Sequence, residues 1–221
     1  MSAGRDRLRG ARVVVTAGGT REPIDPVRYL GNRSSGKMGN ALACAAAECG
    51  ARVTLVTTAA APEDHRINVV HVETADAMLA VLRMHISGAE VLLMAAAVAD
   101  YRPEQVAAGK LKKRNEPWEL RLVPTVDVLH TLRDLPERNG VFVVGFAAET
   151  DEMVSSAQRK LHDKGMDLIA VNDVSRGDIG MGADHNELTV LDAAGLVEVI
   201  RRAPKAEVAA RLLEIVASRL P

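Results

Sequence analysis

The chain has 221 residues, 48% of them apolar and 26% charged, with 28 basic against 29 acidic residues and a net charge of -1. This is ordinary globular composition, and the balanced charge and few aromatics (one Trp, two Tyr, two Phe) exclude a surface built to bind nucleic acid. No apolar run reaches the about 18 residues of a membrane span, and Met1–Arg12 lacks the apolar stretch of a secretory signal. We therefore expect a cytoplasmic protein with no membrane contact, in which residues 1–11 form a flexible segment.

Short apolar runs alternate with stretches of helical periodicity through the first half of the chain. Strands are predicted at Arg12–Thr16, Arg52–Thr57, Asn68–Val72 and Val91–Val98. Helices are predicted at Met38–Cys49 and at Ala75–Ser87, the latter with Thr74 as N-cap. Val91–Val98 is the most apolar run, so we expect it at the centre of a sheet. Cys44 and Cys49 lie five apart on different helix faces and are expected to be core residues, not a disulfide.

Residues Asp100–Leu122 interrupt this alternation. They are polar, include the basic run Lys110–Arg114 and lack helical periodicity, so we predict an extended arm that leaves the globule. After the arm, helices are predicted at Asp127–Leu135, at Asp151–Lys164 and from Pro204 to Arg219. Strands are predicted at Val141–Phe146 and Leu168–Val171, and a hairpin is predicted from Glu187–Leu191 and Val197–Arg201. The alternation predicts an α/β fold with a mostly parallel sheet and helices on its faces, over residues 1–221 as one domain.

Adjacent glycines, Gly18 and Gly19, follow the first predicted strand. Glycines there let backbone N–H groups approach a phosphate, and ligands of open α/β sheets bind beyond the strand ends. A dinucleotide fingerprint would need G-x-G-x-x-G and an acidic residue at the end of the second strand, but that strand ends Val56-Thr57-Thr58. An NAD(P)-dependent reductase is therefore a disfavoured alternative, and no Tyr-x-x-x-Lys pair supports it.

The segment Gly31–Met38 matches the pattern G-x-x-x-x-G-K without being a P-loop. A P-loop follows its strand directly and ends in a Ser or Thr that holds Mg²⁺, whereas this segment lies well beyond the first strand and has Met38 at that place. Ser34, Ser35, Gly36 and the following helix start still form a donor-rich corner that suits an anion. The six histidines show no metal-ligand spacing, so we expect no protein-held transition metal.

Seven motifs occur in an order that is typical of one family. They are Gly18-Gly19-Thr20, Ile24–Arg28, Asn32–Gly39, Ala95–Tyr101, Lys110-x-Lys112-Lys113, Gly145-Phe146-x-x-Glu149-Thr150 and Asn172-Asp173-Val174. On these residues the chain, from about Arg12 onward, closely resembles the phosphopantothenoylcysteine synthetases, the CoaB domains of bacterial bifunctional CoaBC proteins. The resemblance implies a Rossmann-like three-layer sandwich in which residues 100–122 form a dimerisation and active-site arm.

The resemblance also implies a ligase of coenzyme A biosynthesis. Such enzymes join 4'-phosphopantothenate to L-cysteine: CTP converts the carboxylate to an acyl-cytidylate, releasing diphosphate, and the cysteine amine displaces CMP. Because the substrate carboxylate is itself the nucleophile, the site needs positioning and positive charge rather than an activated Ser or Cys. Mg²⁺ brought by CTP and a homodimer are implied, and no flavin is expected in this chain. The chain is expected to be either a stand-alone enzyme or the C-terminal half of a protein, fused to or excised from a flavin-dependent decarboxylase half. A non-catalytic nucleotide-binding module is the remaining alternative.

The same resemblance assigns the site residues. Asn32 and Lys110 are the implied catalytic residues, the first acting on the acyl-cytidylate and the second on the CTP side. Nucleotide contacts are implied for Gly18, Gly19, Met94, Ala95, Ala96, Asp100, Lys110, Val126, Asp127, Val128, Leu129, Phe146, Lys160 and Lys164. Contacts to the acyl substrate are implied for Arg28, Asn32, Ser34, Ser35 and Gly36. The chain departs from its relatives at Thr125-Val126-Asp127, where they often have Asn-Pro-Asp.

Overall fold

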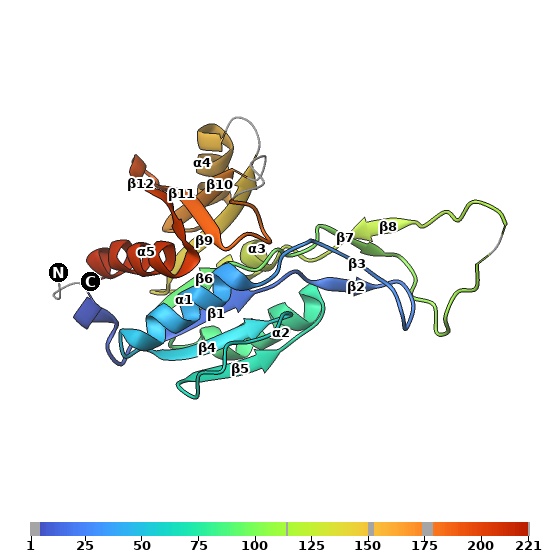
Figure 1. The fold of residues 1–221 in the computed structure, drawn as a ribbon, viewed down its shortest axis with the longest axis horizontal. Coiled ribbons are helices and arrows are strands. Elements are labelled where there is room, and N and C mark those ends of the chain that lie inside the picture. Colours follow the sequence, from blue (N-terminus) through green and yellow to red (C-terminus); the bar gives the residue numbers. More distant parts are fainter. Residues whose placement is uncertain (1–4, 114, 150–152, 174–178, 221) are drawn as a thin grey trace.

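The structure is a computed structural model that describes residues 5–113, 115–149, 153–173 and 179–220. Thr150, Asp151 and Val174, which belong to predicted segments, lie outside these ranges. The described residues form a body of helices packed on a sheet, and a long arm projects from one side of it (Figure 1). Within the described ranges, no helix combines the length and the apolar character that crossing a membrane requires.

An eight-stranded sheet forms the centre of the body, in the order β12-β11-β10-β9-β6-β1-β4-β5. Its strands are β1 (Arg12–Ala17), β4 (Arg52–Thr57), β5 (Ile67–His71), β6 (Val91–Met94), β9 (Phe142–Glu149), β10 (Leu168–Asp173), β11 (His185–Asp192) and β12 (Gly195–Pro204). The first six run parallel, and β11 and β12 add the predicted antiparallel hairpin at one edge. The parallel part is doubly wound, with its reversal between β1 and β6, so the predicted Rossmann-like α/β fold is confirmed.

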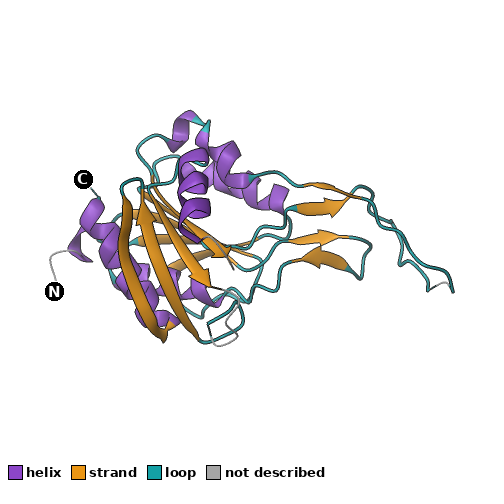
Figure 2. Cartoon of the chain, turned by 90° about the horizontal axis from the view of Figure 1, so that it is seen from above, coloured by secondary structure: helices purple, strands orange, loops and turns teal. Residues whose placement is uncertain are grey.

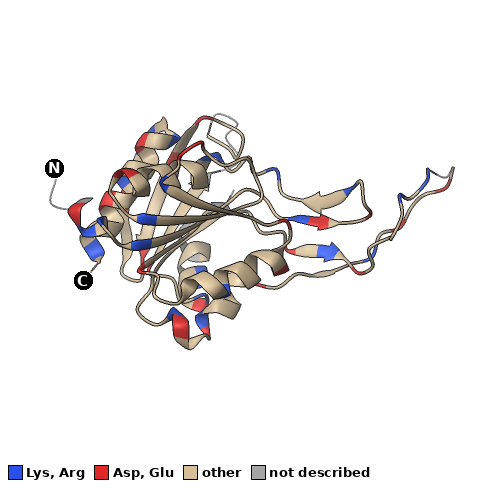
Figure 3. Cartoon of the chain, turned by 90° about the horizontal axis from the view of Figure 1, so that it is seen from below, with Lys and Arg blue, Asp and Glu red and all other residues tan. Residues whose placement is uncertain are grey.

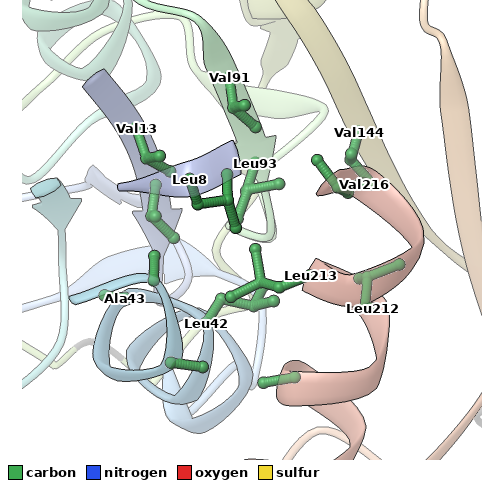
Figure 4. Close-up of a cluster of buried hydrophobic side chains, with 14 of the residues drawn as sticks. Leu8, Val13, Leu42, Ala43, Val91, Leu93, Val144, Leu212, Leu213 and Val216 are labelled. Carbon is green, nitrogen blue, oxygen red and sulfur yellow. The ribbon is translucent and has the colours of Figure 1, made fainter. Parts of the chain in front are cut away.

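Helices cover both faces of the sheet (Figure 2). The helices α1 (Lys37–Glu48) and α5 (Lys205–Arg219) pack against one face, and α2 (Ala75–Ile86), α3 (Val128–Arg133) and α4 (Met153–Asp163) against the other. Each face has its own apolar cluster, and Figure 4 shows Leu42 of α1 and Leu213 of α5 pointing toward Leu93 of β6. Fully burying one such side chain contributes about 1.5–3 kcal/mol, so these two clusters stabilise the layered fold.

The N-terminal segment corrects one prediction. In the described part of the segment 1–11, which is predicted to be flexible, Arg5–Leu8 forms a short 3-10 helix (η1), and the Leu8 side chain is fully buried in the α1–α5 cluster (Figure 4). The Gly10 amide also donates to the Gly50 carbonyl at 2.8 Å. A single leucine in a basic segment carries no periodic signal, so only the packing of the two helices reveals that it belongs to the core.

The central strand is shorter than predicted. β6 ends at Met94, not at Val98, because two of the following amides bond to threonine side chains instead of continuing the strand ladder. The Ala96 amide donates to Thr16 Oγ1 at 3.0 Å, and the Ala99 amide donates to Thr20 Oγ1 at 2.8 Å. Residues 95–99 therefore turn away from the sheet as a loop that is anchored to the end of β1.

Two small hairpins carry the arm. The strands β2 (Arg21–Pro23) and β3 (Tyr29–Gly31), which the sequence analysis missed, pair antiparallel, and β7 (Tyr101–Pro103) pairs with β8 (Leu122–Pro124). Residues 104–121 between β7 and β8, called the arm from here on, extend far from the body (Figure 1). The arm carries charges of both signs (Figure 3). β2 and β3 contact β7, so the arm and the β2–β3 turn leave the body side by side.

Candidate nucleotide-binding pocket

A cavity of about 540 Å³ opens at the carboxyl ends of the parallel strands, beside the reversal between β1 and β6. This is where open α/β sheets bind ligands. Many predicted site residues line it, although they come from distant parts of the sequence: Asn32, Ser34, Gly36, Met94, Ala95, Ala96, Asp100, Val126, Asp127, Val128, Leu129, Phe146, Lys160 and Lys164. The sheet topology therefore brings together the ends of several strands and the helices that follow them.

The start of α1 forms one wall of the cavity, from Gly36 to Gly39. Gly36 occupies the N-cap position with φ 78 in the left-handed region, and as a glycine it has no side chain with which to cap the helix. A Cβ on Gly39 would meet the Ala17 Cβ at 2.5 Å and the Thr16 carbonyl oxygen at 2.6 Å, so only glycine lets α1 lie this close to the end of β1. The free N–H groups and the positive end of the helix dipole therefore face the cavity and favour an anion there.

A second wall is the loop of residues 95–99. Besides its two threonine anchors, this loop accepts hydrogen bonds from Asn32 Nδ2, at 3.4 Å from the Ala97 oxygen and 3.2 Å from the Val98 oxygen. Asn32 thus ties the segment after β3 to the loop after β6 and places an amide on the cavity wall. Small side chains at Ala95 and Ala96 leave the backbone of this wall accessible to a ligand.

The lining carries more positive than negative charge. It contains four lysines (Lys37, Lys160, Lys164, Lys205) and two aspartates (Asp100, Asp127). An excess of ammonium groups beside a helix N-terminus suits a ligand with several phosphates.

Asp127 links two elements of this wall. Its carboxylate accepts from the His130 amide at 3.1 Å, capping α3, and lies 3.1 Å from Lys164 Nζ. Partial burial by itself would raise the pKa of Asp127, but the hydrogen bonds from the His130 amide and Lys164 outweigh it and lower the pKa. Asp127 is therefore ionised at neutral pH and holds the Lys164 ammonium group at the cavity.

The cavity is also lined by residues that were not predicted to belong to the site, among them Lys37, Asn172, Gly180, Met181, Asn186 and Lys205. Lys37 and Asn172 lie inside quoted motifs and could have been proposed from them. Lys205 lies in none of the seven motifs, and in the sequence it is an ordinary lysine at the start of a predicted helix. Its position in the pocket follows only from the packing of α5 beside the loop of residues 179–184.

Three side chains attach the loop of residues 179–184 to its neighbours: Ser35 and Lys37 at the start of α1, and Lys205 at the start of α5. Lys205 Nζ, on a residue only 6% exposed, donates to the Ala183 carbonyl at 2.5 Å. Lys37 Nζ lies 2.6 Å from the Asp184 carboxylate, and Ser35 Oγ donates to the Met181 carbonyl at 2.8 Å. Burial, followed by the charge of Lys37, lowers the pKa of Lys205, whereas Lys37 lowers the pKa of Asp184. The loop is thus a firmly attached wall of the pocket.

Five predicted site residues lie outside the lining: Gly18, Gly19, Arg28, Ser35 and Lys110. Gly18 has φ 84, and a Cβ on it would meet Thr58 Oγ1 at 2.2 Å. A Cβ on Gly19 would meet the Asn32 carbonyl oxygen at 2.6 Å. These two glycines let neighbouring segments pack behind the pocket wall, and their contacts to a nucleotide stay a prediction.

Arg28 and Lys110 both lie on the side of the arm. Lys110 is exposed on the arm itself, and the Arg28 guanidinium forms an ion pair with Asp25 and donates to the Leu111 carbonyl at 2.9 Å. Neither residue lines the pocket of its own chain in this structure, and the ligand contacts predicted for both stay predictions.

The described residues contain no group of three or more His, Cys, Asp or Glu side chains that could hold a metal ion. Any cation in the pocket would depend mainly on oxygen atoms that the ligand brings, with Asp100 and Asp127 as the nearby carboxylates.

The doubly wound sheet and the cationic pocket at its reversal define the class of protein: an α/β protein with a site suited to a nucleotide or another phosphorylated ligand. The chain belongs, more particularly, to the family of the DNA/pantothenate metabolism flavoprotein C-terminal domain, whose model matches residues 8–220.

Relatives of known name agree with this assignment. The chain is 41% identical over 226 residues to the coenzyme A biosynthesis bifunctional protein CoaBC of Mycobacterium tuberculosis, covering 96% of this chain and 53% of that protein. It is also 41% identical over 191 residues to the CoaBC protein of Vibrio vulnificus, covering 85% of this chain and 47% of that protein. The chain therefore spans about half the length of the curated relatives it matches.

Solved structures share the fold. The C-terminal domain of a CoaBC protein superposes with a TM-score of 0.82 at 36% identity, covering 97% of this chain and 98% of that one. A Cab2 mutant in complex with phosphopantothenate-cysteine superposes with a TM-score of 0.76 at 17% identity, covering 98% of this chain and 92% of that one, which supports the fold alone.

Proposed function

We propose that this chain is a CTP-dependent phosphopantothenate–cysteine ligase that acts in the cytoplasm. The observation that carries the proposal is the cationic pocket at the sheet reversal, lined by Asn32, the start of α1 and four lysines, in a chain of the pantothenate metabolism family. Among the described residues, the pocket lining contains no Cys and no His that could activate a hydroxyl. This suits a reaction whose nucleophiles are the carboxylate and the amine of its substrates.

In the first step, a carboxylate oxygen of 4'-phosphopantothenate attacks the α-phosphorus of CTP. A C–O–P link forms, the bond from the α-phosphorus to the bridging oxygen breaks, and diphosphate leaves. Lys160, Lys164 and the N–H groups at the start of α1 would bind the phosphates and stabilise the charge that develops on the leaving group. The small residues Ala95 and Ala96, together with Phe146, would hold the nucleoside.

In the second step, the amine of L-cysteine attacks the acyl carbon. The C–N bond forms, the bond to the cytidylate oxygen breaks, CMP leaves and the amine loses a proton. The Asn32 amide, which donates to the wall carbonyls at 3.2–3.4 Å, would turn to donate to the oxyanion. A neutral amide can donate to the developing oxyanion without repelling it.

Mg²⁺ would accompany CTP and neutralise part of the triphosphate charge. The absence of a three-ligand cluster among the described residues is compatible with an ion held chiefly by phosphate oxygens, with Asp100 or Asp127 as a supporting ligand.

Lys110 would act in the pocket of a second copy, in a homodimer formed through the arm. The arm projects away from the body (Figure 1), and Lys110 on it does not line the pocket. The arm also carries exposed apolar residues, Val106, Leu111 and Trp118. Two-fold pairing would cover them and deliver a lysine to each pocket. Deleting residues 103–119 should then convert a dimer to a monomer in sedimentation velocity, and a deletion variant that stays dimeric would contradict the arm's role.

Release of diphosphate tests the function directly. With 4'-phosphopantothenate present we expect diphosphate from CTP and much less from ATP, and we expect CMP release to require L-cysteine. CTP should raise the melting temperature, whereas NADH should not. CTP binding without diphosphate release in any substrate combination would instead identify a non-catalytic nucleotide-binding module.

A further inference from the structure

A buried aspartate lies at the turn between β2 and β3, outside the pocket. Asp25 is 3% exposed, and both of its carboxylate oxygens are used. Oδ1 accepts from the Val27 and Arg28 amides at 2.8 and 2.9 Å. Oδ2 accepts from Arg28 Nε at 3.0 Å and, across 86 positions of sequence, from the Leu111 amide at 3.1 Å. One oxygen therefore shapes the turn, and the other binds the arm.

The same turn contacts the arm at further points. Arg28, which forms an ion pair with Asp25, donates to the Leu111 carbonyl at 2.9 Å, and its guanidinium carbon lies 5.2 Å from the centroid of the Trp118 ring. The Ala107 amide donates to the Ile24 carbonyl at 3.0 Å. Residues 24–28 thus attach to the arm at Ala107, Leu111 and Trp118.

Among the described residues of the arm, few other contacts determine its path. Between residues 104 and 121, Ala107 and Leu120 are half-buried, and the other described residues are exposed. At the base, the Glu104 amide donates to the Arg121 carbonyl at 3.0 Å. Because this segment lacks an apolar core, its direction depends on the polar contacts to the turn. Lys110 immediately precedes Leu111, the residue that Asp25 and Arg28 bind on both its amide and its carbonyl.

We propose that Asp25 is a positioning residue that fixes the arm and thereby sets where Lys110 is presented. The proposal deepens the proposed function, since it rests on Lys110 acting in a pocket. Were Asp25 only a turn residue, the two contacts of Oδ1 would be enough. The contacts of Oδ2 with Leu111 and with the arginine that also binds Leu111 assign it this second role.

Asp25→Asn separates the two halves of this carboxylate. The asparagine oxygen can still accept from the Val27 and Arg28 amides, but its NH₂ group replaces Oδ2 and faces donors, Arg28 and the Leu111 amide. Hydrogen exchange followed by mass spectrometry should then show about tenfold faster exchange at the Leu111 and Ala107 amides. The melting temperature should stay close to that of the unmodified protein, because the body is untouched.

Asp64→Asn is the matched control. Asp64 also pairs with an arginine close in sequence: its Oδ1 accepts from the Arg66 amide at 3.0 Å, and Arg66 Nη2 lies 2.6 Å from its Oδ2. It lies on the body, so its loss should leave exchange in the arm unchanged. Trp118→Ala tests the arm side without altering Asp25 and should speed exchange at Leu111 by a smaller factor.

A double-mutant cycle with Lys110→Ala tests the positioning role. If Asp25 acts through Lys110, Asp25→Asn lowers diphosphate release several-fold in the unmodified enzyme and has no further effect in the Lys110→Ala background. Equal fold-losses in both backgrounds would overturn the positioning role, and unchanged exchange at Leu111 in Asp25→Asn would overturn the attachment itself. A protein that releases no diphosphate at all would refute the ligase and the positioning role with it, while the exchange data would still decide on the attachment.

Discussion

The body and the arm of this protein keep their shapes by different means. Two apolar clusters, one on each face of the sheet, hold the body, and the pocket is built on it from strand ends and helix starts. The arm buries almost nothing and is held by a few polar contacts to one turn, centred on Asp25. A site that needs both regions therefore combines a rigid half with a half whose geometry depends on a small number of hydrogen bonds.

The largest difference between the two regions should appear with a matched pair of leucines. Leu93 on β6 is fully buried, whereas Leu111 on the arm is 37% exposed and contacts Asp25 and Arg28 through its backbone. We expect Leu93→Ala to lower the free energy of unfolding by about 2–5 kcal/mol, and Leu111→Ala by less than about 0.5 kcal/mol. Urea unfolding measures both, and equal losses would mean that the arm belongs to the cooperative core.

A matched pair of glycines makes the comparison at the site itself. A Cβ on Gly39 would lie 2.5 Å from the Ala17 Cβ and 2.6 Å from the Thr16 oxygen, whereas a Cβ on Gly109 would meet nothing within 4 Å. Gly39→Ala must displace α1 from β1, so we expect a loss of about 1–3 kcal/mol in stability and a strong loss of CTP binding. Gly109→Ala should change neither quantity. Calorimetric titration with CTP and thermal unfolding provide the test, and normal CTP affinity in Gly39→Ala would argue against an anion site at the start of α1.

Alanine variants at two helix caps in the body can distinguish an effect on stability from an effect on CTP binding. Asp127 caps α3 at the pocket and holds Lys164, and Thr74 caps α2 away from it by accepting from the Ala77 amide at 3.1 Å. Each alanine variant should cost about 1 kcal/mol of stability. Only Asp127→Ala should also weaken CTP binding, because Lys164 loses its partner. A Thr74→Ala protein with equally weakened binding would show that the effect comes from stability alone.

The smallest effect is expected from mild acid, which should leave the attachment of the arm to Asp25 unchanged. The Arg28 guanidinium and the amides around it hold the pKa of Asp25 well below its ordinary value of 3.8. Because the pKa of Asp25 is lowered in the folded state, the ionised carboxylate stabilises the arm fully at any pH above the ordinary pKa. This stabilisation is lost only when the pH falls through the lowered pKa of the folded state. Exchange protection at the Leu111 amide, corrected for the intrinsic rate, should thus be the same at about pH 7 and pH 5. Loss of protection in that interval would show that another group controls the attachment.

Much of the body could be predicted from periodicity. β1, β4, α2 and α5, as well as the β11–β12 hairpin, lie within a residue or a few residues of their predicted positions, because each buries one continuous apolar face that repeats along the chain. The predicted elements differ from the structure where side chains replace the backbone partners of a strand, and where a strand is very short. β6 ends early because threonine hydroxyls bind the amides of residues 96 and 99, and β2 and β3 are too short to show a pattern.

The sequence by itself determined the alternating α/β fold, the glycine-rich corner at the start of α1 and the family, since these depend on local periodicity and on motifs of adjacent residues. Only the tertiary structure decided which side chains share a pocket. Lys205 reaches it because α5 packs beside α1, and Arg28 turns from it because Asp25 and Leu111 hold its guanidinium. Such contacts join residues that are far apart in the chain, and they form only when the sheet order has brought distant segments within hydrogen-bonding distance.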